Sequence, residues 1–423
     1  MRISEQWLRE WANPRLTLAE LTQQLTMTGL EVEGVEPAAP EFSGVVVGLV
    51  TALAPHPEAE RLRVATVDIG RGESLRIVCG APNAKVGMRA PVALPGASLL
   101  GAVKIATTTL RGVQSQGMLC SAKELGLGED GDGLLELPST MTVGDDLRAA
   151  LALDDQVFTV SPTPNRGDCL SIAGVAREVS VIGNCPLTPV ATDPVTPLSA
   201  AQLEVTLADP ADCPRYVGCV IRDLDPTAQT PLWLRERLRR AGLRSLGPLV
   251  DVTNYVMLEL GQPLHAFDLD KLEGGITVRR AREGEILVLL NDQRIALAPD
   301  TLLITDASGP VALAGIMGGA ATAVGDVLAM YFWKARFPRE HRGPRAPLWV
   351  ADRRLAALRA AASIRLQARA AEQATRLLMG IAGSKPGPLV DVLPIGTYRH
   401  QSRLRCVRTV SAGCSAWTSS PSR

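Results

Sequence analysis

The spacing of hydrophobic and polar residues divides the chain into stretches of different texture, and residues 1–40 open with two short helical patterns. Ser4 stands where it can cap the first helix. Residues 17–20 read Thr-Leu-Ala-Glu, the spacing of a capping box, and apolar residues follow at helical intervals up to Gly29. We predict two short helices here, each with too small an apolar face to be stable without a partner.

Residues 44–138 change to short apolar runs that are broken by Gly and Pro. The runs lie at 45–47, 64–67, 75–78 and 90–94. Short β-type segments separated by turn residues are typical of a small barrel. We therefore predict a β-barrel in this part of the chain.

Four prolines between residues 186 and 197 mark a second boundary, after which helical and strand-like patterns mix. The clearest helix begins at Thr230-Pro231, with Pro in its first turn, and ends at Gly242. Strand-like runs follow at 276–278, 286–290 and 301–304. This stretch is predicted to be an α+β domain.

The pattern changes again from about residue 327. Between Tyr331 and Ala370 there are nine Arg and one Lys against two acidic residues, and residues 332–347 keep neither the 2.0 nor the 3.6 period. One interpretation is a basic, Ala-rich helix over 351–370. The residues after 403 also lack the pattern of packed sequence.

Composition limits the class of protein. The 423 residues are enough for two to four domains, and 46% hydrophobic residues provide a buried core. Basic and acidic residues balance at 44 each, which leaves room for a local basic face. The apolar runs are shorter than a membrane span, and Arg9 and Glu10 interrupt the start of the chain. We expect neither a transmembrane helix nor a signal peptide.

The eight cysteines are scattered, without a CxxC pair or a Cys/His cluster. Such spacing predicts reduced, mostly buried thiols of a cytoplasmic protein rather than disulfides or a metal site. They are Cys79, Cys120, Cys169, Cys185, Cys213, Cys219, Cys406 and Cys414.

Three groups of segments together resemble a known family. The first comprises HPEAERL at 56–62, IVCGAPN at 77–83 and GMLCSAKELG at 117–126. It resembles the OB-type tRNA-binding domain that several synthetases share. The second, TPNRGDCLS at 163–171 with GVARE at 174–178, and the third, VDVTNYV at 250–256 with GQPLHAFD at 261–268, are similar to the β subunit of bacterial phenylalanine–tRNA ligases.

This resemblance implies an α+β multidomain architecture. An OB-fold β-barrel at 41–149 would be inserted in a small α/β N-terminal domain made of 1–40 and 150–195. An α+β editing domain of the B3/B4 type would follow at 200–400, with 327–366 aberrant, and 401–423 would be a truncated or disordered tail. The residues 1–40 and 150–195 should then pack together.

The barrel would bind tRNA by shape and phosphate contacts, because it lacks a row of aromatics for base stacking. For any single cation a solvated surface charge is the alternative, and Asn83 is interpreted as a turn residue. The helix after Pro231 is also Arg-rich, as a solvated outer face or as a face toward the tRNA acceptor end. The candidate phosphate contacts in the barrel are His56, Arg61, Arg63, Lys85, Arg89, Lys104 and Arg111.

The resemblance implies that the third domain hydrolyses tyrosine wrongly attached to phenylalanine tRNA. A pocket that accepts Phe by apolar fit cannot strongly exclude a substrate that adds only a hydroxyl, so a second pocket must bind that hydroxyl. Thr253, Asn254 and His265 would line this pocket. The glycines of the segment 314–319, namely Gly315, Gly318 and Gly319, would let backbone N–H groups approach the ester.

His265 admits two interpretations, a residue that orients water or substrate and a structural histidine. Asp251 and Asp268 are interpreted as turn carboxylates, not catalysts. In the family a strand with a glutamate that senses the tyrosine hydroxyl follows the glycines. The nearest register here places Lys334 at that position, and the family's subsequent GRAR-like and HRFERGVDP-like segments are missing.

Resemblance resumes at 367–370, 374–378 and 387–390, and ends after about Val407. A compensated pair of frameshifts would produce such a departure and return, and real divergence or an insertion is the alternative. We expect little or no hydrolysis of tyrosine by this chain. We expect no cofactor on this chain, since the resemblance places the use of ATP and Mg²⁺ in the whole α2β2 ligase with its α subunit.

The resulting hypothesis is a β subunit that contributes tRNA binding and, in intact relatives, editing. The alternative is a non-catalytic tRNA-binding fragment from a disrupted gene. The expected partners are tRNA and the α subunit, with no DNA or membrane, and copurification with an α subunit would separate the two hypotheses.

Overall fold

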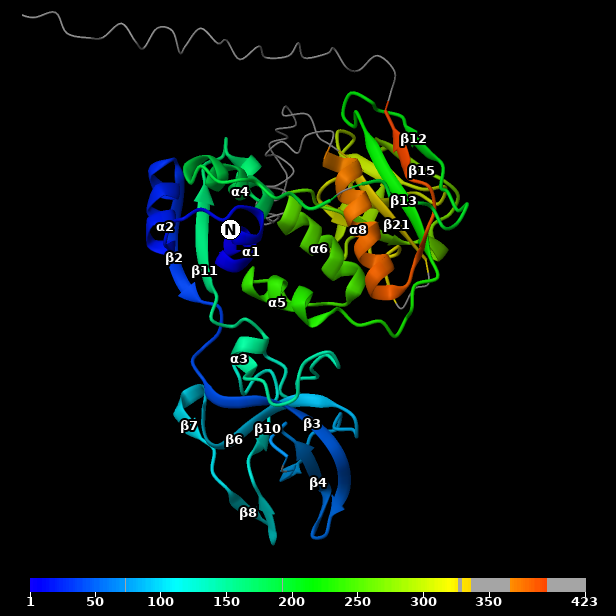
Figure 1. Ribbon diagram of the computed structural model, residues 1–423. Helices are drawn as coiled ribbons and strands as arrows, with labels where there is room; N and C mark the ends of the chain where they lie inside the picture. The colour runs from blue at the N-terminus through cyan, green and yellow to red at the C-terminus, as the bar shows by residue number, and fades with distance from the viewer. Residues whose placement is uncertain (73, 192, 326–328, 336–365, 394–423) are drawn as a thin grey trace, which may run out of the picture.

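The computed structural model describes residues 1–72, 74–191, 193–325, 329–335 and 366–393. Figure 1 shows a β-rich lobe, called here the β lobe (residues 43–146), at one end and the remaining elements gathered at the other. Of the segment predicted to be aberrant, residues 327–328 and 336–365 lie outside the described residues. The tail from residue 394 onward and most of the predicted 351–370 helix also lie outside them.

The N-terminal part, residues 1–37 with 156–182, is built on one small sheet. Its order is β1 (Arg2–Ser4), β11 (Gln156–Pro162) and β2 (Leu30–Pro37), all antiparallel. Three helices accompany it: α1 (Glu5–Trp11), α2 (Leu18–Met27) and α4 (Ile172–Ile182). Since β11 lies between β1 and β2, residues far apart in the chain complete one sheet.

Both N-terminal helices predicted from the sequence are confirmed. The Ser4 hydroxyl accepts a hydrogen bond from the Trp7 N–H at the start of α1. Thr17 and Glu20 form both bonds of the capping box at the start of α2. The apolar face of α2, including Leu21 and Leu25, is fully buried in the core.

The β lobe contains a sheet in the order β10-β6-β3-β4-β5, with β7 paired to β6 and a separate β8–β9 hairpin. The four apolar runs predicted as strands fall in β3, β4, β5 and β6 and are confirmed. The lobe has apolar clusters of its own on both faces of the sheet. Its elements are β3 (Ser43–His56), β4 (Ala59–Asp68), β5 (Ser74–Cys79), β6 (Arg89–Leu99), β7 (Val103–Lys104), β8 (Thr108–Leu110), β9 (Val113–Ser115) and β10 (Met118–Leu119).

In the third part (residues 201–393), the described residues form two larger sheets and three α-helices. One sheet runs β12-β15-β18-β19-β20 and the other β14-β21-β13-β22, with β23 also paired to β13. The helices are α5 (Leu232–Arg240), α6 (Pro248–Leu260) and α8 (Leu366–Ala382). The strands are β12 (Val205–Leu207), β13 (Tyr216–Arg222), β14 (His265–Asp268), β15 (Ile276–Arg280), β16 (Ile286–Val288), β17 (Arg294–Ala296), β18 (Leu302–Thr305), β19 (Pro310–Leu313), β20 (Met317–Gly318), β21 (Ala329–Ala335), β22 (Lys385–Pro386) and β23 (Val390–Val392).

Helix α5 confirms the prediction of a helix between Pro231 and Gly242. Its apolar side is buried and includes Leu234 and Leu238, with Ala241 directly after the helix. These residues share one apolar cluster with Leu8 of α1 and with residues of α4, α6 and α8. The N-terminal part and the helices of the third part therefore have a common core, whereas the β lobe keeps separate ones.

Strand β21 lies in the middle of its sheet, antiparallel to both β13 and β14. It includes residues 332–335, the beginning of the segment whose sequence pattern has no period. Backbone pairing on both edges needs no alternation of side chains, which explains why a strand can form there. In this register Trp333 pairs with His265, and Lys334 pairs with Val217.

Within the described residues, every helix is too short or too polar to cross a bilayer. The six described cysteines are free thiols, five of them buried and Cys185 half-buried, as predicted. Burial raises the pKa of the Cys120 and Cys219 thiols to about 12, so they stay protonated at neutral pH. Cys406 and Cys414 lie outside the described residues.

Candidate functional site

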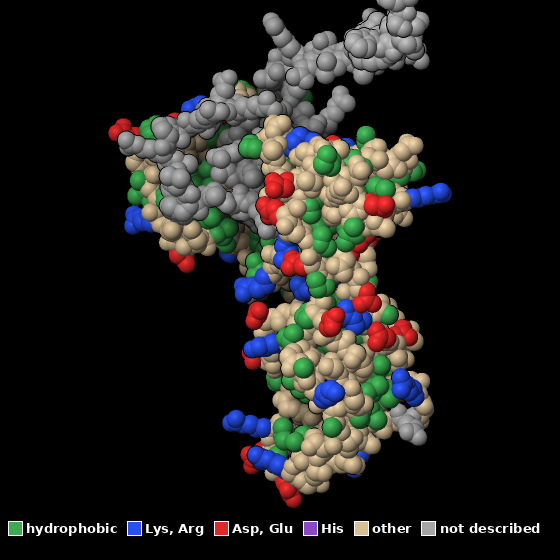
Figure 2. Space-filling view, turned by 90° about the vertical axis from the view of Figure 1, so that its left-hand side faces the viewer, with side chains coloured by type: hydrophobic (Ala, Val, Ile, Leu, Met, Phe, Trp, Pro, Cys, Tyr) green, Lys and Arg blue, Asp and Glu red, His purple; other side chains and the backbone are tan. Residues whose placement is uncertain are grey.

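Four of the seven candidate phosphate contacts of the β lobe are exposed to solvent. Arg61, Lys104 and Arg111 make no ion pair or hydrogen bond through their side chains to any residue that the structure describes. Lys85 forms an exposed ion pair with Glu136 at 2.9 Å, which leaves it accessible. Figure 2 shows Lys and Arg side chains projecting from several points of the β lobe, with acidic side chains among them. The cations are dispersed rather than gathered into one patch.

The other three candidates bond within the protein or are partly covered. His56 is buried, its Nδ1 accepts from the Glu58 N–H, and its Nε2 therefore donates to the Leu110 carbonyl at 3.1 Å. Arg63 donates to the backbone carbonyls of Ala81 and Ala84. Arg89 is half-buried at the start of β6, and its Nε is buried without a hydrogen-bond partner. These bonds hold loops of the lobe in place. They direct the ring N–H of His56 and the bonded N–H groups of Arg63 toward the protein and not toward solvent.

Asn83 is confirmed as a turn residue. Its side-chain amide donates to the Leu134 carbonyl at 3.0 Å and accepts from the Leu134 N–H at 2.8 Å. Both ends of the amide are used, so the side chain fixes the 81–84 turn against residue 134 and does not face a base.

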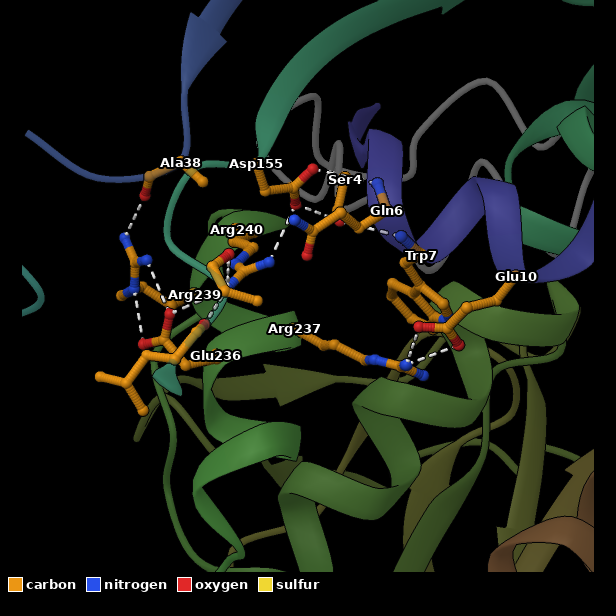
Figure 3. A network of polar contacts seen from close by, with 12 residues as sticks. Ser4, Gln6, Trp7, Glu10, Ala38, Asp155, Glu236, Arg237, Arg239 and Arg240 are labelled. Carbon is orange, nitrogen blue, oxygen red and sulfur yellow. Dashed lines mark hydrogen bonds and ion pairs between the residues drawn. The ribbon is translucent and has the colours of Figure 1, made fainter. Parts of the chain in front are cut away.

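The arginines of α5 form neither a solvated outer face nor a free nucleic-acid face, which corrects both interpretations of this helix. Arg237 donates to the Tyr255 hydroxyl and pairs with Glu10 of α1. Arg239 and Arg240 donate to backbone carbonyls outside the helix. Figure 3 shows these side chains pointing from α5 toward the N-terminal part. Only Arg235 of this helix has no partner among the described residues.

The second candidate site lies where β14 meets β20. A Cβ atom on Gly318 would stand 2.4 Å from Cε1 and 2.5 Å from Nε2 of His265, so the imidazole lies directly on the Gly318 backbone. The ring also makes an edge contact with Phe267, at 4.6 Å between centroids. Glycine is required at 318 because any side chain would displace His265. The structure therefore brings together two of the predicted site residues.

Gly315 and Gly319 surround this contact in different ways. Gly315 has a φ of +71°, a conformation that favours glycine, and it turns the chain between β19 and β20. A Cβ on Gly319 would stand 2.7 Å from the Val311 carbonyl oxygen, so this position also needs glycine for close packing. The two glycines shape the backbone that carries Gly318.

Thr253 and Asn254 lie on α6, the helix that precedes β14, and both are buried. The Thr253 hydroxyl donates to the Val250 carbonyl of its own helix at 2.8 Å. The contacts of His265 described above are to β14 and β20 instead. A shared pocket of these residues therefore stays a prediction.

Asp251 and Asp268 are hydrogen-bonded carboxylates, as predicted, but Asp251 lies in the first turn of helix α6 and Asp268 ends strand β14, so neither lies in a loop turn. Asp251 is fully buried and accepts from the Thr230 hydroxyl and the Leu246 N–H, among others. Asp268 accepts from the Asp270 N–H at 3.1 Å and pairs with Lys271. Their bonds hold the ends of α6 and β14 in place.

Sequence reasoning missed Leu290. Its Cδ1 lies 3.3 Å from the position of a Cβ on Gly318, and its N–H donates to the Gly318 carbonyl at 3.1 Å. Leu290 is also partly exposed to solvent. The only signal in the sequence was a leucine at the end of a strand-like run, which core packing explains equally well.

A cluster of Asp168, Cys169 and Glu178 has the composition of a metal site, but an arginine lies among the ligand atoms. Arg166 pairs with Asp168 at 3.2 Å and Glu178 at 2.7 Å, and its Nη2 is 3.0 Å from the Cys169 sulfur. Burial raises the pKa of the Cys169 thiol to about 12. The TPNRGDC turn is thus held by a guanidinium, which leaves these ligands to a structural role.

The comparisons with known proteins agree with this geometry. A family described as a putative tRNA binding domain matches residues 45–146, the β lobe, and the B3/4 domain family matches residues 212–329. The two matches define the class: a protein that combines a domain of the putative tRNA binding family with a domain of the B3/4 family, the second of which contains the His265–Gly318 contact.

Curated relatives narrow this class. The chain is 52% identical over 402 residues to a phenylalanine–tRNA ligase beta subunit of Methylococcus capsulatus, covering 93% of this chain and 51% of the relative. It is 47% identical over 410 residues to that of Chromobacterium violaceum, covering 96% and 52%. The chain belongs to the family of phenylalanine–tRNA ligase beta subunits. It spans about half the length of the curated relatives it matches.

Among solved structures, the chain is similar to an N-terminal fragment of the phenylalanyl-tRNA synthetase beta subunit from Pyrococcus horikoshii. The identity is 13% and the TM-score 0.32, over 57% of this chain and 68% of that one. Such a score carries no structural argument.

Proposed function

We propose that the chain acts in phenylalanine–tRNA ligation as part of the beta subunit, to which it contributes tRNA binding. The observation that carries this proposal is the set of exposed cations Arg61, Lys104 and Arg111, which have no partner among the described residues and lie on a lobe that matches a putative tRNA binding family. Flexible, fully hydrated cations bind phosphates by releasing counterions, which requires no base recognition. Their dispersion over the lobe suits a folded RNA, whose phosphates are spread over a surface.

We propose further that the β lobe is an OB-fold inserted in an N-terminal α/β domain. The boundaries would be 41–149 for the lobe, 1–40 with 150–195 for the N-terminal domain, and 200–400 for the B3/B4-like editing domain. Pairing of β11 with β1 and β2 supports this division, because both sides of the insertion contribute to one sheet.

For the B3/B4-like domain we propose a binding site for the aminoacyl end of tRNA around His265 and Gly318. The imidazole can orient water or the ester, and the missing side chain at Gly318 lets the ring lie against the backbone in a fixed position. Discrimination of tyrosine would be weak here. A hydrogen bond from the substrate hydroxyl to a charged acceptor is worth about 1.5–3 kcal/mol, and this chain has Lys334 where the family has a glutamate.

The partners and cofactors follow from the family. The chain would assemble with an α subunit into an α2β2 ligase and bind tRNA in the cytoplasm, while ATP and Mg²⁺ would act in the whole ligase. An enzyme activity would thus belong to the assembly. The alternative function, a tRNA-binding fragment without the α subunit, is separated from it by copurification with that subunit.

Two assays on the full chain test the proposal. Titration with phenylalanine tRNA at low and moderate salt should show binding that weakens steeply as salt rises. Deacylation of tyrosyl-charged phenylalanine tRNA should be slow, and faster when residues 327–366 are replaced by the corresponding segment of a relative. Salt-independent or undetectable binding would contradict the first proposal, and equal deacylation rates would contradict the role of the Lys334 segment.

A further inference from the structure

Two short segments connect the β lobe to the rest of the protein, and they are bound to each other. Residues 38–42 lead into the lobe, and residues 147–155, which begin with helix α3 (Leu147–Ala150), lead out of it. The Ala38 N–H donates to the Asp155 carbonyl at 2.9 Å. Arg148 donates to the Pro40 carbonyl at 2.8 Å and to the Asp154 carboxylate at 2.9 Å. The two segments are therefore bonded into one unit, called here the stalk (residues 38–42 and 147–155).

Helix α5 of the third part binds both segments of this stalk. Arg239 donates to the Ala38 carbonyl at 2.8 Å, on the incoming segment. Arg240 donates to the Leu151 and Ala152 carbonyls at 3.0 and 3.1 Å, on the outgoing segment. Figure 3 shows Arg239 and Arg240 on the same helix, with Arg239 bonded to Ala38 and Arg240 to Asp155.

Ion pairs fix the orientation of both guanidinium groups. Arg240 is 6% exposed and pairs at 2.9 Å with Asp155, which is 2% exposed. Asp155 also accepts from the Ser4 hydroxyl and the Gln6 N–H, which ties the pair to β1 and α1. Arg239 forms a two-pronged pair with Glu236 one turn earlier in α5. A planar guanidinium oriented in this way is pre-organised for its carbonyl partners.

Apolar packing beside these bonds is incomplete. A cavity of about 560 Å³ lies between the β lobe, the N-terminal part and α5. Its walls include Trp7 of α1, Met141 near the stalk and Trp233 of α5. Leu232 of α5 still packs against the apolar cluster of the lobe. With a cavity at the junction, the directional bonds of Arg239 and Arg240 are needed to fix the orientation of the lobe.

We infer that Arg239 and Arg240 are positioning residues that clamp the stalk and hold the β lobe at one orientation to the B3/B4-like domain. A tRNA bound on the lobe is thereby presented to the His265–Gly318 site in a single pose. The presentation of tRNA rests on the proposed function; the clamping of the lobe does not. Removing the clamp should leave the lobe folded, because its apolar clusters are its own.

The test uses the full chain with Arg239→Met, and with the paired change Arg240→Met/Asp155→Asn. The paired change removes both buried charges together, which avoids leaving one of them unpaired. Arg235→Met is the matched control, since Arg235 lies on the same helix without a partner among the described residues. Fluorescent labels on non-natural residues at the exposed positions Val86 and Leu246 report the distance between the lobe and the third part.

The distance distribution should be narrow in the wild-type chain and in Arg235→Met, and clearly broader in both clamp variants. Circular dichroism should show the same secondary structure in all four proteins. A narrow distribution in both clamp variants would overturn the inference. Unfolding of the paired variant would leave Arg239→Met to decide, since Arg239 is half-buried and its buried partner Glu236 keeps Arg240 at 3.6 Å.

A second readout follows the RNA. A photo-crosslinking residue at Leu290, beside Gly318, should label the acceptor end of bound tRNA in the wild-type chain. In the clamp variants the labelling should fall about tenfold or more, because a lobe without fixed geometry gives the tethered RNA end a low effective concentration at the site. The dissociation constant for tRNA should stay nearly unchanged. Undiminished labelling would overturn the presentation of tRNA, whereas failure of all tRNA binding would overturn the proposed function and leave the distance measurement to judge the clamp.

Discussion

The β lobe and helix α5 are both rich in cations, but they use them in opposite ways. On the lobe, Arg61, Lys104 and Arg111 stay exposed and unpaired within the described residues. On α5, Arg239 and Arg240 bond to backbone carbonyls of the stalk, and Arg240 also pairs with the carboxylate of Asp155. The density of arginine in a sequence therefore does not locate an RNA interface. What separates the two cases is whether acceptors from distant segments already satisfy the guanidinium.

The same contrast holds for the cores. The N-terminal part and the helices of the third part share one apolar cluster, so they fold onto each other. The lobe packs on itself and is joined through the stalk and the arginines of α5. Bonds at that junction should matter most to stability where they are buried, and bonds on the lobe should matter most to RNA binding.

The largest expected effect is on the buried pair of the junction. Asp155→Ala leaves the Arg240 guanidinium buried without its carboxylate, which should lower the free energy of unfolding by about 3–5 kcal/mol. Asp154→Ala is the control, because its side chain is 74% exposed and its pair with Arg148 should contribute no more than about 1 kcal/mol. Urea denaturation of both variants measures the difference. Similar losses for the two neighbours would break the distinction between buried and exposed pairs.

The next effect concerns the His265 site. Gly318→Ala forces a Cβ atom onto the imidazole at 2.4 Å, and should cost about 1–3 kcal/mol of unfolding free energy as overpacking does elsewhere. Gly380→Ala, in α8, meets nothing within 4 Å and should stabilise the chain by up to about 1 kcal/mol. Thermal unfolding should shift in opposite directions for the two variants. A stable Gly318→Ala protein would mean that His265 does not need to rest on this backbone.

A smaller effect should appear in the pH dependence of the free energy of unfolding, through the buried carboxyl of Glu259. Arg237 bonds to Tyr255, whose hydroxyl donates to Glu259 at 2.8 Å, and Gln373 donates to the other oxygen of Glu259 at 2.9 Å. Burial raises the pKa of Glu259 above its usual 4.5, although these hydrogen bonds oppose the rise. The stabilising contribution of this carboxyl is therefore present below pH 4.5 and is lost as the pH rises through its folded pKa.

Glu259→Gln should remove that dependence, so its free energy of unfolding should gain on the wild-type value between pH 4.5 and neutrality. Glu285→Gln is the control of opposite sign. A hydrogen bond from Arg279 lowers the pKa of Glu285, so its contribution is present at higher pH and is lost on acidification. Urea midpoints should diverge in these two directions, above about pH 4.5 for Glu259→Gln and below it for Glu285→Gln. Parallel curves for wild type and Glu259→Gln would contradict the buried state of the carboxyl.

Much of the local structure could be predicted from the sequence because its causes are local. The capping box at Thr17, the proline at the start of α5 and the glycine after it act within one turn of helix. The partners of the charged residues could not be predicted in the same way. Arg240 pairs with Asp155, which lies 85 positions away in the chain, and His56 bonds to the Leu110 carbonyl, 54 positions away. Nothing in a single sequence records such a pairing.

The sequence likewise predicted only part of the candidate site. The motifs indicated the family and pointed to His265 and Gly318 as site residues, and the fold brings these two into contact. Leu290 was missed because its place beside Gly318 depends on the pairing of Leu289 with Gly319. Thr253 and Asn254 share the motif with His265, but the Thr253 hydroxyl is bonded within its own helix. A pocket that Thr253 and Asn254 share with His265 therefore stays a prediction.

The comparison between the two cation-rich regions is tested most directly by the salt dependence of tRNA binding to the full chain. The triple variant Arg61→Ala/Lys104→Ala/Arg111→Ala should unfold within about 0.5 kcal/mol of wild type, since all three are exposed. Its plot of log binding constant against log salt should be shallower by up to about 2–3, because each phosphate contact contributes about 0.7–0.9 to the slope. The variant Arg239→Met, which removes a bonded arginine of α5, should keep the wild-type slope. A wild-type slope in the triple variant together with a shallower one in the α5 variant would contradict the account.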